Sequence, residues 1–250
     1  MPDAFSAAVQ SDGLIWLALT FLMAGLVRGF TGFGTALIFM PVAARFIPVA
    51  DAIVVLNVTG VVSMILLVPR AWRESDRGQV GVLALAALAT APVGVMLLAR
   101  LDAGLVRWAL SAAATLTLVA LIAGWRHSHR LRWPGLGGIG AAAGALGDMT
   151  GLTGPPVILF YLSGPGSVTT IRANTMLFLS VLDLGIVANL FARGLVTSQA
   201  IWLGFLLSVP YFISVAIGQA LFHPKRERAY RRVAYSVIGL AILTGLPLFD

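Results

Sequence analysis

The most restrictive feature of this sequence is a series of long apolar runs separated by short polar connections. With 59% hydrophobic and 11% charged residues and a mean hydropathy of +0.94, the chain is too apolar to be a soluble domain. Most of the runs approach the ~20 residues that a helix needs to cross a membrane. The sequence therefore predicts an all-α polytopic membrane protein. The runs cover residues 14–44, 52–69, 80–99, 108–125, 134–166, 173–192, 195–223 and 233–249.

The polar residues outside these runs exclude several other classes of protein. The opening MPDAFSAAVQSDG carries Asp3 and Asp12 where a signal peptide has basic residues, so we expect it to be retained. The absence of cysteine excludes disulfides and thiolate metal sites. A net charge of +7 would suggest nucleic acid in a soluble protein, but here the arginines cluster at the ends of apolar runs. That distribution indicates membrane topology and argues against a nucleic-acid partner.

The opening apolar pattern returns in the second half of the chain. AGLVRGFTGFGTALIFMP (24–41) and AGALGDMTGLTGPPVILF (143–160) align without a gap at an offset of 119 residues. A looser match at an offset of 117 pairs Asn57 with Asn174. We therefore divide the chain into an N-terminal repeat, 1–125, and a C-terminal repeat, 126–250. Each has a glycine-broken segment, at about 14–47 and about 134–166, followed by three spans.

The distribution of basic residues decides whether the broken segments cross the membrane. If all eight segments crossed, the basic stretches 126–132 and 225–232 would face opposite sides, against the positive-inside rule. If both broken segments enter and return on one side, with the N-terminus outside, both stretches are cytoplasmic. Each half then crosses three times, so the second half is inverted relative to the first, as in many secondary transporters. We expect a multi-pass protein of the cell inner membrane with two inverted repeats, each a re-entrant helical hairpin followed by three transmembrane helices.

In this topology most basic residues are cytoplasmic and a few are external. Those expected in the cytoplasm are Arg70, Arg73, Arg77, Arg126, Arg130, Arg132, Arg172, Lys225, Arg226, Arg228, Arg231 and Arg232. Those expected outside are Arg45, Arg100, Arg107 and Arg193.

RGFTGFG (28–34) and DMTGLTGPP (148–156) are expected to form the tips of the two hairpins. Irregular backbone is tolerated at membrane depth only where protein buries it or water reaches it. Pro155 suits the first turn of a returning half-helix and Thr153 can cap that turn, while Thr31 and Thr35 can do similar work in the first half. Two half-helix N-termini would then meet near the midplane. Their free N–H groups and positive dipole ends favour an anion.

The candidate anion-binding residues lie at these tips and one helix beyond them. Arg28 would cost ~2.5–3.5 kcal/mol on insertion scales if it faced lipid, so it is expected to face a cavity or a partner. The competing interpretation is an ion pair with Asp148. Asn57 and Asn174 have amides that can donate to an oxyanion, against a competing role in bonding helices together. The full candidate set is Arg28, Thr31, Gly32, Phe33, Gly34, Asn57, Thr150, Gly151, Thr153, Gly154 and Asn174.

Two acids are set deep in apolar sequence and are candidates for proton coupling. Asp148 lies at the second hairpin tip, and its competing roles are the pair with Arg28 or a position near cytoplasmic water. Asp183 lies in the middle of the run 173–192, where the competing role is a bond to a hydroxyl or amide of another helix. Ionisable residues inside membrane spans are usually functional, which keeps both candidates open.

The paired openings GLVRGFTGFGTALIFMP and GALGDMTGLTGPPVILF, each followed by three spans, resemble the sulfite exporter TauE/SafE family of membrane permeases. The resemblance covers nearly the whole chain. It implies a secondary transporter for sulfite, organosulfonates or related sulfur-containing anions, with the substrate held near the hairpin tips. Family members more often have consecutive glycines at the tip. Here Phe33 and Gly34 interrupt one run and Thr153, Gly154 and Pro155 stand in the other, so the particular anion stays open.

Two other function classes compete with a transporter. An intramembrane aspartyl protease would need two facing aspartates with a Gly-x-Gly-Asp motif, which the residues before Asp148 do not form. Histidines occur only at positions 127, 129 and 223, all in loops, so we expect no buried zinc site, no cofactor and no enzymatic activity. An anion channel or a membrane-embedded structural subunit remains the alternative. No ring of like charges lies in any span, but a homo-oligomer could supply one.

Overall fold

The computed structural model describes residues 2–124, 133–164, 166–194, 196–223 and 227–246, and over these residues its regular structure is helical, as predicted. The basic linker expected at 126–132 and the basic residues Lys225 and Arg226 lie outside the described residues. The helices are α1 (Pro2–Val9), α2 (Leu14–Thr31), α3 (Thr35–Ala43), α4 (Val49–Glu74), α5 (Arg77–Arg100), α6 (Ala103–Ala123), α7 (Trp133–Thr150), α8 (Gly154–Ser163), α9 (Val168–Ala192), α10 (Ser198–Leu221) and α11 (Glu227–Gly245).

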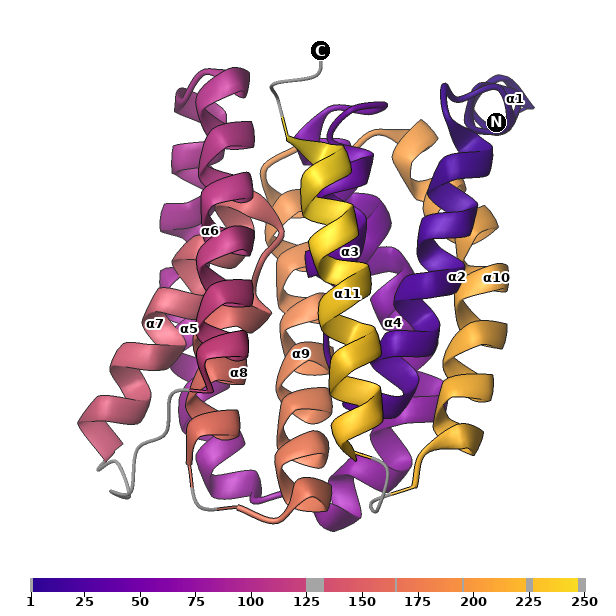
Figure 1. Cartoon of the computed structure of the whole chain (residues 1–250). Helices are drawn as coiled ribbons and strands as arrows, with labels where there is room; N and C mark the ends of the chain where they lie inside the picture. The colour runs from indigo at the N-terminus through magenta and orange to yellow at the C-terminus, as the bar shows by residue number, and fades with distance from the viewer. Residues whose placement is uncertain (1, 125–132, 165, 195, 224–226, 247–250) are drawn as a thin grey trace.

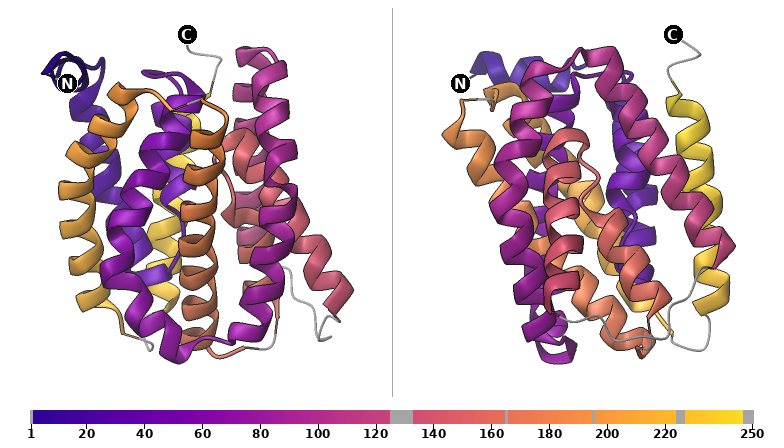
Figure 2. Two further views of the ribbon diagram at one scale, coloured as in Figure 1. Left: turned by 180° about the vertical axis from the view of Figure 1, so that it is seen from behind. Right: turned by 90° about the vertical axis from the view of Figure 1, so that its left-hand side faces the viewer.

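The helices stand side by side in one bundle, and two hairpins of shorter helices enter it from opposite ends (Figures 1 and 2). α2 descends from the upper end in Figure 1 and α3 returns to that end, after which α4, α5 and α6 traverse the bundle. α7 rises from the lower end and α8 returns to it, after which α9, α10 and α11 traverse the bundle. This arrangement supports the predicted inverted topology, while the division at residues 125 and 126 stays a prediction.

Six of the helices are long and apolar enough to cross a membrane, namely α2, α4, α5, α6, α9 and α10. α2 is among them by length and composition, although it leads into the bend of a hairpin. α11 was expected as a span but is not among the six, because its first two turns contain four charged residues, Glu227, Arg228, Arg231 and Arg232. It nevertheless runs the height of the bundle (Figure 1).

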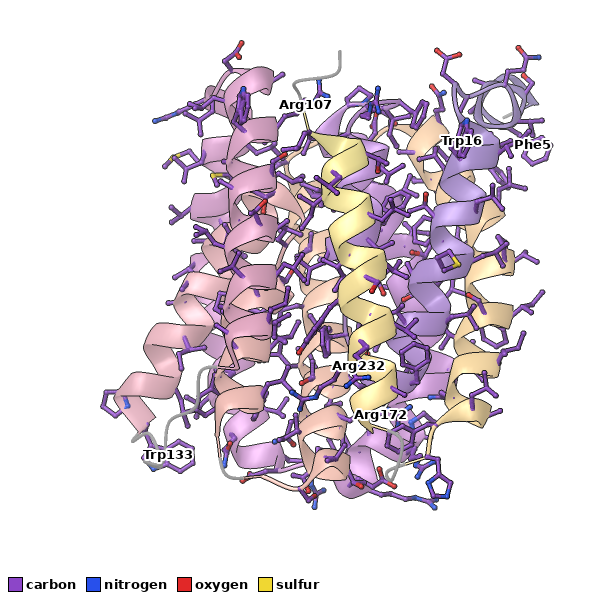
Figure 3. The ribbon with its side chains drawn as sticks, viewed as in Figure 1. Phe5, Trp16, Arg107, Trp133, Arg172 and Arg232 are labelled. Carbon is purple, nitrogen blue, oxygen red and sulfur yellow. The ribbon has the colours of Figure 1, made fainter. Side chains whose placement is uncertain are left out.

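The outer surface of the bundle suits a lipid environment. Large apolar side chains such as Ile15, Ile65 and Leu116 are more than two-thirds exposed. Trp16 lies toward the upper end of the bundle and Trp133 toward the lower end (Figure 3). Tryptophan at both levels is typical of the two membrane interfaces.

Each hairpin bends at a glycine that follows a threonine. Gly32 has φ +88° and Gly151 has φ +78°, in the left-handed region that glycine adopts without steric penalty. The Thr31 hydroxyl bonds the Val27 carbonyl at 2.7 Å, and the Thr150 hydroxyl bonds the Leu146 carbonyl at the same distance. The backbone N–H two residues after each threonine donates to its hydroxyl at 3.2 Å. The threonines therefore terminate α2 and α7.

The expected capping of the returning half-helices is partly wrong. Pro155 lies in the first turn of α8, as predicted. Thr153 precedes α8 with helical backbone angles and makes no side-chain capping bond. α3 likewise begins at Thr35 after Gly34 without a side-chain cap. The first-turn N–H groups of both half-helices are thus left without side-chain caps.

The hairpins pack against helices of the opposite half in matching ways. α2 packs mainly on α10, and α7 packs mainly on α5. A Cβ on Gly218 of α10 would lie 2.5 Å from the Leu26 carbonyl oxygen, and a Cβ on Gly94 of α5 would lie 2.4 Å from the Ala145 carbonyl oxygen. Leu26 and Ala145 are equivalent at the 119-residue offset of the sequence match. The equivalent crossings support the repeat and interlock its halves.

The topology can be tested with single thiols, because the chain has no cysteine of its own. Ser198 at the start of α10 and Gly78 at the start of α5 are exposed at opposite ends of the bundle. We expect a membrane-impermeant maleimide to label Ser198→Cys in intact cells and Gly78→Cys only after permeabilisation. Labelling of both variants from the same side would contradict the arrangement.

Candidate functional site

A small cavity lies where the two returning half-helices begin. The first turns of α3 (Gly34 to Leu37) and of α8 (Gly154, Pro155 and Ile158) line it. α2, α4, α9 and α10 complete the walls with Arg28, Leu56, Asn57, Gly60, Leu179, Asp183 and Tyr211. The N–H groups in the first turn of a helix have no partner within the helix, and the dipole makes that end positive. Two such ends facing one cavity favour a negatively charged ligand.

Arg28 brings a guanidinium to this cavity from the last turn of α2. Its Nη2 atom lies 3.5 Å from Oδ2 of Asp183 on α9, and both side chains are nearly buried, at 5% and 12% exposure. Nε and Nη2 of Arg28 have no hydrogen-bond partner among the described residues, and neither does Oδ2 of Asp183. The pair is therefore close enough to offset the two charges and still leaves N–H donors unused.

The ion pair corrects one of the sequence interpretations. The competing role considered for Arg28 was a pair with Asp148, but the carboxylate beside it is that of Asp183. The alternative bond of Asp183 to an interhelical hydroxyl or amide is replaced by the same contact. Removing either member would leave an uncompensated buried charge, which typically costs ~3–5 kcal/mol.

Gly60 on α4 is a member of the site that the sequence patterns did not indicate. A Cβ at this position would lie 2.3 Å from Oδ2 of Asp183 and 2.5 Å from its carboxyl carbon. Any larger residue would therefore force the carboxylate to move. Gly60 fixes how closely α4 and α9 can approach at the level of the ion pair.

Tyr211 and Thr35 form a second polar contact at the cavity. Their hydroxyl oxygens lie 2.9 Å apart, with Tyr211 on α10 and Thr35 at the start of α3. Both residues are buried and both line the cavity. Neither was in the predicted set, although a tyrosine in the middle of an apolar run is a signal that could have placed Tyr211 there.

The structure brings about half of the predicted residues into this one cavity. Those that line it are Arg28, Gly34, Asn57, Gly151, Thr153, Gly154 and Asp183. Asn57 also donates to the Ile53 carbonyl at 2.7 Å, so part of its hydrogen-bonding capacity is used within α4.

The other predicted residues lie elsewhere. Thr150 terminates α7, and Asp148 is buried outside the cavity lining. Asn174 accepts a hydrogen bond from the Asp76 backbone N–H at 2.7 Å and so holds α9 to the turn between α4 and α5. A Cβ on Gly32 would lie 2.9 Å from Arg172, which makes Gly32 a packing position as well as a bend.

Thr31 and Phe33 line a second cavity, together with Arg172 and Phe222. Arg172 donates to the Gly29 carbonyl and places its guanidinium 4.2 Å from the centre of the Phe222 ring. Figure 3 shows Arg172 toward the lower end of the bundle. This arrangement fastens the tip of the first hairpin to the start of α9.

The packing of Gly60 against Asp183 predicts a measurable effect on stability. We expect Gly60→Ala to lower the free energy of unfolding by about 1–3 kcal/mol, the usual cost of overpacking a tight core position. The matched control is Gly81→Ala on α5, where a Cβ would meet nothing within 4 Å. Thermal unfolding in detergent compares the two, and equal melting temperatures would show that Gly60 does not position Asp183.

The sequence of this chain matches a known family of membrane proteins. The family model for the sulfite exporter TauE/SafE matches residues 17–245, which is nearly the whole chain. No curated protein and no solved structure gave a match. This match confirms the family that the glycine-rich openings of the two hairpins predicted. The chain belongs to the TauE/SafE family of sulfite exporters.

Proposed function

We propose that this protein is a secondary transporter, an exporter or permease, that moves sulfite, an organosulfonate or a related small sulfur-containing anion across the bacterial inner membrane by alternating access. The observation that carries the proposal is the buried guanidinium of Arg28, with Nε and Nη2 unused, in a cavity where two half-helices begin. Membership of a sulfite exporter family supports the same class of substrate.

The chemistry of the cavity fits a small oxyanion. Sulfite and sulfonates present three oxygens on one sulfur, and a guanidinium can donate two parallel N–H bonds to two of them. The first-turn N–H groups of α3 and α8 supply further donors around the same volume, and so does the one hydroxyl proton that the bond between Thr35 and Tyr211 leaves free. These donors would replace the water that an anion loses on entering the membrane.

Asp183 gives the site a means of release. Its carboxylate lies 3.5 Å from Nη2 of Arg28 and is the counter-charge of the guanidinium. An incoming anion must compete with that carboxylate and is repelled by it, which limits the affinity. A carrier needs such limited affinity, because an anion held too tightly would not leave on the other side.

The two hairpins that enter from opposite ends support alternating access (Figure 1). Each contributes the first turn of its returning helix to the cavity, through Thr35 in one case and Gly154 in the other. A movement of one hairpin would open the cavity toward the end from which it enters, while the other hairpin keeps the opposite end closed.

Arg28→Gln tests the proposal in proteoliposomes under anaerobic conditions. Loss of a charged hydrogen-bond donor is worth about 1.5–3 kcal/mol, so we expect half-saturation for sulfite counterflow to rise at least ~10-fold. The half-saturation concentration of Arg28→Lys should lie between those of wild type and Arg28→Gln, because lysine keeps the positive charge but lacks the two parallel N–H donors of the guanidinium. Wild-type counterflow in Arg28→Gln would refute the site.

Arg70→Gln is the matched control for this experiment, because Arg70 is exposed and pairs with Glu74 one turn away. It should transport like wild type. The same measurement addresses the channel alternative: a flux that rises linearly with sulfite concentration and shows no counterflow in the wild-type protein would replace the carrier by a channel.

A further inference from the structure

Asp148 is a buried acid that the anion cavity does not use. It lies in the last turn of α7, is fully buried, and neither of its carboxyl oxygens has a hydrogen-bond partner among the described residues. An ionised carboxylate in such a place is costly, and the negative end of the α7 dipole adds to the cost. The surroundings therefore favour the neutral, protonated acid in this conformation.

The packing of α7 on α5 keeps Asp148 away from solvent. A Cβ on Gly94 of α5 would lie 2.8 Å from Cβ of Asp148, so the two helices are in close contact there. No ionisable residue lies on α5 between Arg77 and Arg100. Of the other helices that pack on α7, α4 carries Asp51, Arg70, Arg73 and Glu74, α6 carries Arg107, and α8 carries Tyr161.

α9 supplies the polar groups that face Asp148. Asn189 lies near the carboxyl, and its Nδ2, like the two carboxyl oxygens, has no hydrogen-bond partner among the described residues. Arg193, one turn further along, donates from Nε to Oδ1 of Asn189 at 3.2 Å and acts electrostatically on Asp148. Arg193 is exposed at the C-terminal end of α9, so these groups lead from the buried acid toward the upper end of the bundle.

The hairpin that carries Asp148 also forms a wall of the anion cavity. Gly147 is adjacent to Asp148, and a Cβ on it would lie 2.7 Å from the Thr153 hydroxyl. Thr153 and Gly154 line the anion cavity. A displacement of Asp148 would therefore move the residues that contact the anion.

We propose that Asp148 is the proton-binding site of proton-coupled anion transport, distinct from the anion site at Arg28 and Asp183. The protonated acid stays buried as in this structure. When its proton passes to water, the resulting carboxylate favours a position of the second hairpin in which it is hydrated near Asn189 and Arg193. Asp183 does not take this role, because Arg28 offsets its charge.

The inference rests on the proposed transport function, and one experiment separates the two. Sulfite counterflow at equal pH on both sides measures the anion site alone, whereas accumulation driven by a pH gradient measures coupling. We expect wild-type proteoliposomes to show both activities. Asp148→Asn carries a neutral amide at every pH. We expect its counterflow to stay within about twofold of wild type and its gradient-driven accumulation to fall at least ~10-fold. Asp12→Asn, which changes an exposed acid, is the matched control and should keep both activities.

Gradient-driven accumulation by Asp148→Asn equal to that of wild type would overturn the assignment. If Asp148→Asn does not fold, the variant Asn189→Leu is measured in its place. We expect Asn189→Leu to slow gradient-driven uptake and to leave counterflow unchanged. Equal effects on uptake and counterflow would contradict a proton route past Asn189. Wild-type counterflow without any response to a pH gradient would overturn the inference and leave the transporter standing. Absence of wild-type counterflow would instead remove the proposed function.

Discussion

The ion pair between Arg28 and Asp183 is the interaction on which the centre of this protein depends. A guanidinium at this depth is stable only beside a counter-charge, and the counter-charge comes from a helix that follows more than a hundred residues later. Their contact requires Gly60, because a side chain there would displace the carboxylate. The distances between α2, α4 and α9 therefore depend on the ion pair between Arg28 and Asp183 and on the absence of a side chain at Gly60.

The two hairpins bend alike but carry different charges beside the bend. Arg28 lies one turn before the bend at Gly32, which carries the chain into α3 with its N-terminus beside the guanidinium. The second hairpin bends at Gly151 with the same threonine contacts, but the residue equivalent to Arg28 is Gly147. Each hairpin thus holds one charged residue in the last turn of its longer helix, a cation in the first and the acid Asp148 in the second. Under the proposed function, this asymmetry within similar hairpins would let one half bind the anion and the other respond to protons.

Much of the fold could be predicted from sequence, because it follows from local constraints. Hydrophobic run length gave the helices, and the glycines at 32 and 151 marked the bends, since only glycine enters the left-handed region at no cost. The partners across helices could not be predicted in this way. Asp148 and Asp183 are both acids in apolar runs, and the rotation of each helix, which no local pattern specifies, decides which of them meets Arg28. For the same reason Tyr211 and Gly60 were missed, and Asn174 was placed at the site although it bonds the turn at Asp76.

The most direct measurement is a structure of the protein determined with selenite, an oxyanion of the same shape as sulfite whose selenium is located by anomalous scattering. We expect one selenium site within hydrogen-bonding reach of the Arg28 guanidinium and of the first turns of α3 and α8, and we expect it to be absent in Arg28→Gln. A selenium site beside Arg172 in the second cavity, with none beside Arg28, would show that the anion does not bind at Arg28.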